Sequence, residues 1–152
     1  MPITEARPED MPLVRELFEE YERFLGFDLC FQNFQAELDA LPGAYGAPSG
    51  ALLLAREEEQ TLGCVGLRAL ESGVCEMKRL YLRPQARGKG LGLALCRSVI
   101  VRARTLGYNQ MKLDTVSKLE KAIELYRSLG FTECTAYCHN PQPDVQYFEL
   151  QL

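Results

Sequence analysis

One segment of the sequence, residues 74–115, restricts the fold more than any other. Residues 74–83 (VCEMKRLYLR) predict a strand, and apolar residues then recur at helical spacing from Leu91 to Leu106. Residues 110–115 (QMKLDT) predict a second strand. A strand, a helix and a strand in this order form a right-handed crossover, which makes the two strands parallel neighbours in one sheet. The chain is therefore expected to contain a parallel strand pair with a helix packed against it.

The residues before this segment predict two helices and a group of antiparallel strands. Residues 2–6 predict a short strand, followed by a helix that begins between Pro8 and Pro12 and ends at Gly26. A second helix stops at Pro42-Gly43, before a loop, and carries on one face Phe31, Phe34, Leu38 and Leu41. Short strands joined by tight turns then predict a meander over residues 51–56, 62–69 and 74–83.

The residues after the crossover predict one more helix and a hairpin. Ser117, with Glu120 three residues later, has the pattern of a capping box that opens a helix ending at Gly130. Residues 131–137 and 145–150 predict two paired strands. The full order is βααβββαβαββ, a single α/β (α+β) domain over residues 1–152. Its mixed, mostly antiparallel sheet carries helices on both faces.

Composition narrows the class of protein. The 152 residues are 47% hydrophobic and 25% charged, which is typical of one globular domain. A net charge of −4 disfavours nucleic acid as a partner. No apolar run is long enough for a membrane span and the first residues contain no targeting segment, so a cytoplasmic protein without a membrane partner is expected.

The six cysteines are expected to be reduced, because a cytoplasmic compartment keeps thiols free. None forms a C-x-x-C pair, and the single histidine, His139, cannot complete a Cys/His zinc set, so no metal site is predicted. We expect all six to be buried or half-buried small hydrophobic residues. His139 is expected to be an exposed turn residue.

The glycine-rich segment Arg87-Gly88-Lys89-Gly90-Leu91-Gly92 follows a predicted strand and opens a predicted helix. The first turn of a helix has unpaired N–H groups that, with the helix dipole, suit a phosphate. Two basic residues add positive charge, so the segment predicts a pyrophosphate site. The Walker and dinucleotide-binding patterns are both absent from it. A turn that contains glycines only for its backbone shape, with solvated basic residues, is the alternative.

The wider context resembles the acyl-CoA-binding motif of the GNAT superfamily of N-acetyltransferases. Its pattern [QR]-x-x-G-x-[GA] after a strand is matched by Arg87, Gly90 and Gly92. The downstream residues Ala122-x-x-x-Tyr126-x-x-x-Gly130-Phe131 resemble the second signature of the family. The expected element order is also similar to the family fold over nearly the whole chain.

This resemblance implies a reaction and a set of cofactor contacts. Acetyl-CoA would be the co-substrate, and a primary amine would attack its thioester directly. The backbone of Leu80, Tyr81 and Leu82 would bind the pantetheine arm, and a backbone N–H near Leu82 would stabilise the oxyanion. The backbone N–H groups of Gly88, Lys89, Gly90, Leu91 and Gly92 would hold the pyrophosphate, with the side chains of Arg87 and Lys89 supporting the phosphates.

The resemblance also implies two catalytic side chains. Tyr126 would donate a proton to the departing thiolate, and Glu76 would act as general base, often through water. The alternatives are a packed tyrosine whose hydroxyl has a protein partner, and a solvated strand glutamate paired with Lys78 or Arg79. Leu119 stands where the family often has a CoA-contacting asparagine, so one contact is expected to be missing or replaced.

Two other functions stay open from the sequence: a non-catalytic acyl-CoA-binding or sensing module, and an unrelated nucleotide-phosphate binder. The acceptor is also open, although the negative net charge favours a cationic small molecule over an anionic one. A free amino acid, a polyamine, an aminoglycoside or a protein N-terminus would each supply an amine. Tyr21 and Phe31 are candidates for acceptor specificity, and a homodimer is possible for this fold.

Overall fold

The computed structural model describes residues 2–152, apart from the side chain of Phe31. Its strands are β1 (Ile3–Glu5), β2 (Ala51–Glu57), β3 (Gln60–Glu71), β4 (Val74–Leu82), β5 (Gln110–Val116), β6 (Thr132–Glu133) and β7 (Val145–Gln151). They form one sheet in the order β1-β2-β3-β4-β5-β7-β6. β4 and β5 pair in parallel and every other neighbouring pair is antiparallel, which confirms the mixed, mostly antiparallel sheet.

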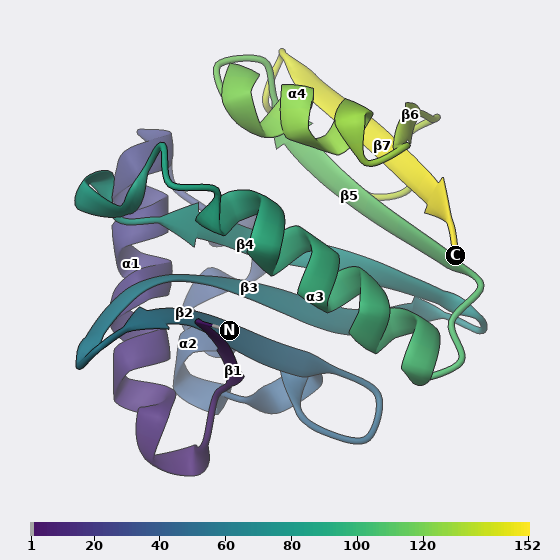
Figure 1. The fold of residues 1–152 in the computed structure, drawn as a ribbon. Coiled ribbons are helices and arrows are strands. Elements are labelled where there is room, and N and C mark those ends of the chain that lie inside the picture. Colours follow the sequence, from purple (N-terminus) through teal and green to yellow (C-terminus); the bar gives the residue numbers. More distant parts are fainter. Residues whose placement is uncertain (1) are drawn as a thin grey trace.

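Helices cover both faces of this sheet (Figure 1). They are α1 (Met11–Leu25), α2 (Phe34–Ala40), α3 (Leu91–Thr105) and α4 (Glu120–Ser128). Side chains of β2 alternate between the two faces: Leu53 belongs to the core under α3 and α4, whereas Leu52 and Leu54 belong to the core under α1 and α2. The central strands are therefore apolar on both sides, which explains the nearly continuous hydrophobic run of residues 51–55.

The ends of α1 and α3 agree with the sequence signals. α1 begins at Met11, between the two prolines, and Gly26 follows its last residue with φ +80°. Gly107, with φ +91°, follows the end of α3 in the same left-handed conformation. Glycine adopts this conformation without the steric penalty that a Cβ atom brings, so each of these glycines terminates the helix before it.

The predicted second helix is wrong in its first half. The chain forms a separate 3-10 turn at Cys30–Gln32, and α2 begins only at Phe34. Asn33 between them has φ +56°, a left-handed conformation that asparagine tolerates better than most residues and that interrupts a helix. The prediction that Phe31 faces the core with Phe34 lies outside the described residues.

The predicted capping box and final hairpin are also corrected. Ser117 does not cap α4: its hydroxyl donates to Asp144 Oδ2 at 2.8 Å, and Leu119 holds the cap position. The strand expected at 131–137 is reduced to Thr132–Glu133. The following residues turn toward the sheet, where Tyr137 and Asn140 bond to side chains of β4 and β5. Side-chain contacts with β4 and β5 thus replace most of the backbone pairing that the sequence pattern of residues 131–137 predicts with residues 145–150.

Four of the cysteines are buried or half-buried as expected, but Cys30 and Cys138 are exposed, which corrects that prediction for these two. Each lies outside the regular elements that form the core, one in the 3-10 turn before α2 and the other in the loop before β7. All six are free thiols. His139 is exposed, as its place beside a turn predicts.

Candidate active site

The site lies where β4 and β5 separate. Their parallel pairing covers only Val74–Glu76 against Gln110–Lys112. Beyond these residues the strands diverge, and α4, β5 and β7 stand apart from the rest of the sheet (Figure 1). A cleft of about 590 Å³ occupies the fork. Residues of α1 and of α4 both line it, so the cleft passes through the sheet from one face to the other. We call these the α1 side and the α4 side.

A β-bulge marks the part of β4 that lines the fork. Between the pairs Cys64–Tyr81 and Gly66–Lys78, β4 has two residues, Arg79 and Leu80, opposite one residue of β3. Arg79 has φ +61°, a strained conformation for a residue with a side chain. A bulge bends its strand and increases the local twist, which is consistent with the divergence of β4 from β5.

Strong contacts hold this bulge from the α1 side. The Arg79 guanidinium donates two hydrogen bonds of 2.9 Å to the carboxylate of Glu37 on α2, and it lies 5.1 Å from the ring centroid of Phe34. Burial raises the pKa of Glu37, but the hydrogen bonds and charge of Arg79 outweigh it and hold that pKa below its usual value. The buried thiol of Cys64 donates to the Arg79 carbonyl at 3.3 Å. Both the side chain and the carbonyl of the strained residue are therefore satisfied.

The glycine-rich segment forms the entrance on the α4 side. Gly88 and Gly90 both have φ +79°, and a Cβ atom at either would meet no atom within 4 Å. These glycines are therefore needed for backbone conformation and leave the space beside them open. Gly90 caps α3 and accepts a bond from the Ala94 N–H at 3.1 Å, so the N–H groups of the first turn point outward. This end of a 15-residue helix has the donors that a phosphate requires.

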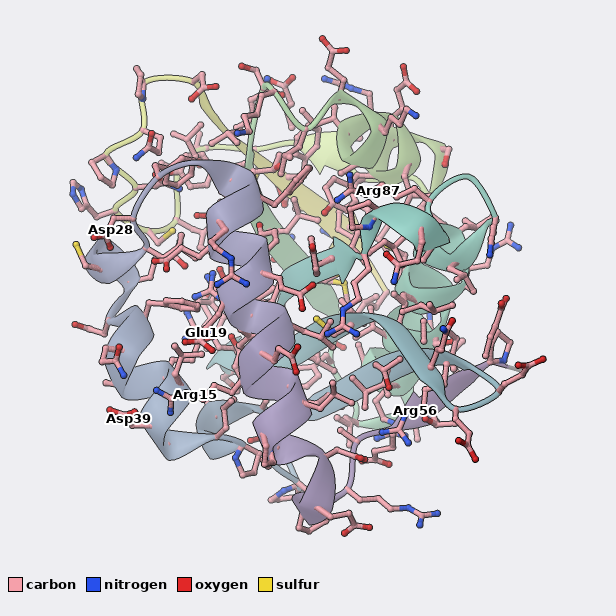
Figure 2. The ribbon with its side chains drawn as sticks, turned by 90° about the vertical axis from the view of Figure 1, so that its left-hand side faces the viewer. Arg15, Glu19, Asp28, Asp39, Arg56 and Arg87 are labelled. Carbon is pink, nitrogen blue, oxygen red and sulfur yellow. The ribbon has the colours of Figure 1, made fainter. Side chains whose placement is uncertain are left out.

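Six of the nine residues predicted to bind the cofactor line the cleft, namely Leu80, Tyr81, Leu82, Arg87, Gly88 and Gly92. The other three lie beside it: Lys89 and Gly90 are exposed, and Leu91 is buried against Leu62 and Ala86. Arg87 lies next to the upper end of α1 (Figure 2). Its Nε donates to the Leu82 carbonyl at 3.1 Å, and its guanidinium lies 4.5 Å from the ring centroid of Phe24.

Tyr126 reaches the cleft from α4. It is 6% exposed, and its ring packs against Phe131 and Phe148 at centroid distances of 5.8 and 6.4 Å. Burial is the main cause that raises the pKa of Tyr126 well above its usual value, and the nearby Cys96 thiol adds to the effect. The hydroxyl therefore keeps its proton at neutral pH. Its hydroxyl has no hydrogen-bond partner within the described part of the chain. The alternative expected from sequence, a packed tyrosine with its hydroxyl bonded to protein, is not what the structure has.

Glu76 lies in the sheet next to the cleft and is not among its lining residues. It is 1% exposed, which excludes the solvated strand glutamate. Arg68 Nε donates to Oε1 at 2.8 Å, and the Tyr137 hydroxyl donates to Oε2 at 2.6 Å. The ammonium of Lys78 lies 3.7 Å from Oε2. Both oxygens are therefore engaged, and any proton from a substrate would reach Glu76 through an intermediary.

Sequence reasoning missed several polar residues of the cleft. On the α1 side these are Lys78, Asp114, Gln32 and Asn140; Thr115 completes the set from β5. Thr115 is 6% exposed and its buried Oγ1 has no hydrogen-bond partner among residues 2–152. It lies on the same face of β5 as Met111 and Leu113, which belong to the core under α3 and α4. No sequence signal marks Lys78 and Asp114, because the last ladder pair, Glu76 with Lys112, is known only from the structure.

The remaining predictions about this region have mixed outcomes. Tyr21 lines the cleft, as a specificity residue must, whereas the side chain of Phe31 is outside the described residues. Leu119 lines it too, at the position where an asparagine was expected from the resemblance. Among residues 2–152 no group of three or more His, Cys, Asp and Glu side chains is arranged to hold a metal ion. Over the same range, every helix is too short or too polar to cross a bilayer.

Comparison with known proteins agrees with this geometry. An N-acetyltransferase of Schizosaccharomyces pombe, itself uncharacterized, is 44% identical over 147 residues, which cover 95% of this chain and 90% of the relative. The fold is similar to that of a GNAT-family acetyltransferase from Staphylococcus aureus, with a TM-score of 0.81, 20% identity, and coverage of 98% of this chain and 97% of the other.

A Salmonella typhimurium protein solved with its cofactor acetyl-CoA also has this fold, with a TM-score of 0.72, 23% identity, and coverage of 98% and 92% of the two chains. Residues 11–131 match the acetyltransferase (GNAT) family itself. That match spans most of the chain, including the bulged strand, the glycine-rich segment and Tyr126. The chain therefore belongs to the GNAT family of acetyltransferases and is an N-acetyltransferase.

Proposed function

We propose that this N-acetyltransferase moves the acetyl group of acetyl-CoA to a primary amine of a small molecule by direct attack, without a covalent enzyme intermediate. The observation that carries the proposal is the Tyr126 hydroxyl, which lines the fork without a protein partner in the described residues. Because no protein group among residues 2–152 accepts from this hydroxyl, it is free to donate to a ligand in the cleft.

The chain's own residues fit acetyl-CoA. The first-turn N–H groups of α3, beside Gly88 and Gly90, would hold the pyrophosphate, with Lys89 as a nearby cation. Arg87 uses Nε for the Leu82 carbonyl, which leaves its terminal nitrogens for a phosphate. The diverging backbone of Leu80–Leu82 would bind the pantetheine arm. The orphan hydroxyl of Thr115 gives this arm a further partner on β5.

The proposed reaction needs two proton transfers, one by Tyr126 and one by Glu76. The thioester supplies an acetyl group whose bond to sulfur breaks as a bond to the amine nitrogen forms, so that a thiolate leaves. Tyr126 Oη would donate its proton to that sulfur and would regain one from the nitrogen after attack. The amine must first lose a proton, and Glu76 would receive it through water, because Glu76 does not itself line the cleft. The net products are an amide, CoA thiol and one proton.

Replacement of Tyr126 by phenylalanine tests this proposal. We expect kcat/KM for CoA release with a primary amine to fall by about 100-fold, the low end for general acid catalysis, because a thiol is a tolerable leaving group unaided. Calorimetric binding of acetyl-CoA should change little. Tyr108→Phe is the matched control, since the Tyr108 hydroxyl donates to the Ser49 carbonyl outside the cleft. Equal rates for Y126F and the unaltered protein would contradict the assigned role.

Cell location and assembly belong to the same proposal. A cytoplasmic location stays a prediction from the sequence, and fractionation of cells followed by detection of the protein would test it. A homodimer stays a prediction of the fold, and sedimentation of the purified chain would test it.

A further inference from the structure

The α1 side of the cleft carries two opposite charges that face the fork. Lys78 and Asp114 stand at the same level of β4 and β5, each two residues beyond the last ladder pair, and both line the cleft. Because residues two apart on a strand point to the same face, Lys78 shares the face of Glu76, and Asp114 that of Lys112. Lys78 and Asp114 do not form an ion pair with each other in the described structure. The divergence of the strands has separated them.

Lys78 is a buried cation with unused hydrogen-bond donors. Its residue exposure is 7%, and its ammonium donates to Gln32 Oε1 at 3.2 Å. Glu76 Oε2 lies 3.7 Å away, beyond hydrogen-bond distance, and already accepts from Tyr137. An ammonium has three N–H donors, so two are without a partner among residues 2–152. Glu76 offsets part of the charge across this ion pair, but two buried N–H donors without acceptors in the described structure remain costly, and an anionic group in the cleft would relieve that cost.

Asp114 has a free oxygen on the opposite wall. Asn140 Nδ2 donates to its Oδ2 at 3.1 Å, and the Cys138 thiol lies 3.8 Å from the same oxygen. Its Oδ1 accepts no hydrogen bond within the described residues. A simple anion would be attracted by Lys78 but repelled by Asp114, and a polyamine would experience the reverse. A molecule with a carboxylate close to its ammonium matches both walls.

We propose that the acceptor is an α-amino carboxylate, whose carboxylate binds Lys78 Nζ and whose amine faces Asp114. The apolar neighbours Tyr21, Phe27 and Leu29 line the same cleft and would contact its side chain. This inference rests on the proposed function, because it names the class of amine that the site acetylates. It departs from the expectation that negative net charge favours a cationic acceptor, since local charge decides binding in a partly buried site.

Paired acceptors test the inference. The protein and acetyl-CoA would be incubated with each coded amino acid that carries a primary α-amine, or with its α-carboxamide, and CoA release would be followed. The amide keeps the amine and side chain but loses the carboxylate charge, and its amine loses a proton more readily, which favours the amide chemically. We nevertheless expect at least one amino acid to exceed its amide in kcat/KM by about 10- to 100-fold, as a charge-assisted hydrogen bond implies.

Variants of Lys78 connect that preference to one side chain. Lys78→Met should reduce the acid-to-amide ratio to near one, through KM rather than kcat, and Lys78→Arg should keep part of it. Lys112→Met is the control of equal charge change: it lies on the same face of β5, outside the cleft lining, with its ammonium 5.6 Å from the Tyr137 ring centroid. Unchanged binding of acetyl-CoA would show that each variant is folded.

A second measurement separates this inference from the proposed function. Amino acid and amide would be titrated calorimetrically into the protein saturated with CoA, which cannot react. Lys78-dependent binding of the amino acid without any turnover supports the carboxylate site and contradicts acetyl transfer. Turnover that is equal for acid and amide, or that Lys78→Met leaves unchanged in its acid-to-amide ratio, keeps acetyl transfer and overturns the inference. Absence of both turnover and Lys78-dependent binding overturns both.

Discussion

The two sides of the cleft differ in the kind of group that forms them. On the α4 side, the main features are backbone conformation and a helix start: Gly88 and Gly90 with positive φ, the free N–H groups of α3, and a buried tyrosine. On the α1 side, the features are charged side chains held by polar groups from distant elements: Arg79 by the Glu37 carboxylate and Lys78 by the amide oxygen of Gln32. One cleft therefore combines a side with local sequence determinants and a side that depends on contacts between residues far apart in the chain.

The largest effect should follow from breaking the charge pair that anchors the α1 side. Arg79→Met leaves Glu37 without its main partner, and loss of one member of a buried pair costs about 3–5 kcal/mol of the free energy of unfolding. Arg15→Met is the control, because the Arg15–Asp39 pair lies between α1 and α2 with side-chain exposures of 39% and 60% (Figure 2). It should cost less than about 1 kcal/mol. Urea unfolding measures both, and equal losses would refute the contrast.

The pH dependence of stability gives a second measure of the same pair. Because Arg79 lowers the pKa of Glu37 in the folded state, the pair contributes stability that is complete above the unfolded pKa and is lost as pH falls through the folded value. The unaltered protein should therefore lose stability below about pH 4. A Glu37→Gln variant, less stable at pH 7, should lose less over that range. Parallel pH profiles of the two proteins would show that Glu37 does not contribute in this way.

This anchor also shows what the sequence could not reveal. Residues 74–83 predicted a strand correctly, but nothing in ten alternating residues shows that Arg79 takes φ +61°. The bulge depends on Glu37, forty-two residues earlier, whose carboxylate accepts from the Arg79 guanidinium. Likewise, Gln32 reaches Lys78 only through the 3-10 turn before α2, and Asn140 reaches Asp114 through a loop that was predicted to lie in a hairpin. Tertiary contacts decide these positions, so periodicity carries no trace of them.

The next largest effect should come from Thr115. Thr115→Val removes a buried hydroxyl without a partner and keeps the side-chain shape, so the free energy of unfolding should rise by about 1–3 kcal/mol in the absence of ligand. If the hydroxyl serves acetyl-CoA, the same variant should bind it several-fold more weakly. Thr105→Val is the control, since the Thr105 hydroxyl donates to the Val101 carbonyl on the exposed face of α3. If Thr115→Val neither raises the free energy of unfolding nor weakens acetyl-CoA binding, the Thr115 hydroxyl has no role in binding the cofactor.

A smaller effect should separate conformation from binding on the α4 side. Gly90→Ala puts a Cβ atom at φ +79° and should cost about 1–2 kcal/mol of stability. Gly107→Ala, at φ +91° beyond the other end of α3, should cost a similar amount, since neither Cβ meets an atom within 4 Å. Only Gly90→Ala should weaken acetyl-CoA binding in calorimetry. Equal binding by the two variants would mean that Gly90 only shapes the turn.

The α4 side was the predictable half because its determinants are local. Residues 74–107 contain these signals: a strand, then three glycines within five residues, then a helical repeat. The structure has each element there. The same reasoning was wrong at Ser117. The sequence has the pattern of a capping box, but the Ser117 hydroxyl instead donates a hydrogen bond to Asp144. A local signal therefore holds where no distant side chain competes for the same group.

The smallest effect should appear where the two sides meet. Phe24 belongs to α1, yet the guanidinium of Arg87 from the glycine-rich segment lies 4.5 Å from its ring centroid. At 42% exposure, such a contact is worth about 0.5–1 kcal/mol. Phe24→Leu should therefore weaken acetyl-CoA binding by about two- to fivefold. The contact would act by holding Arg87 in place for a phosphate, so the loss should vanish when Arg87 is already glutamine.

A double-mutant cycle with Phe24→Leu and Arg87→Gln measures this coupling directly. A coupling energy near the full effect of Phe24→Leu would mean that α1 contributes to cofactor binding through Arg87 alone. Additive effects would mean that Phe24 acts elsewhere, and that the two sides of the cleft are energetically separate. The second result would strengthen the contrast between a backbone-built and a charge-built side, because no side-chain contact would then transmit binding energy from one to the other at this end of the fork.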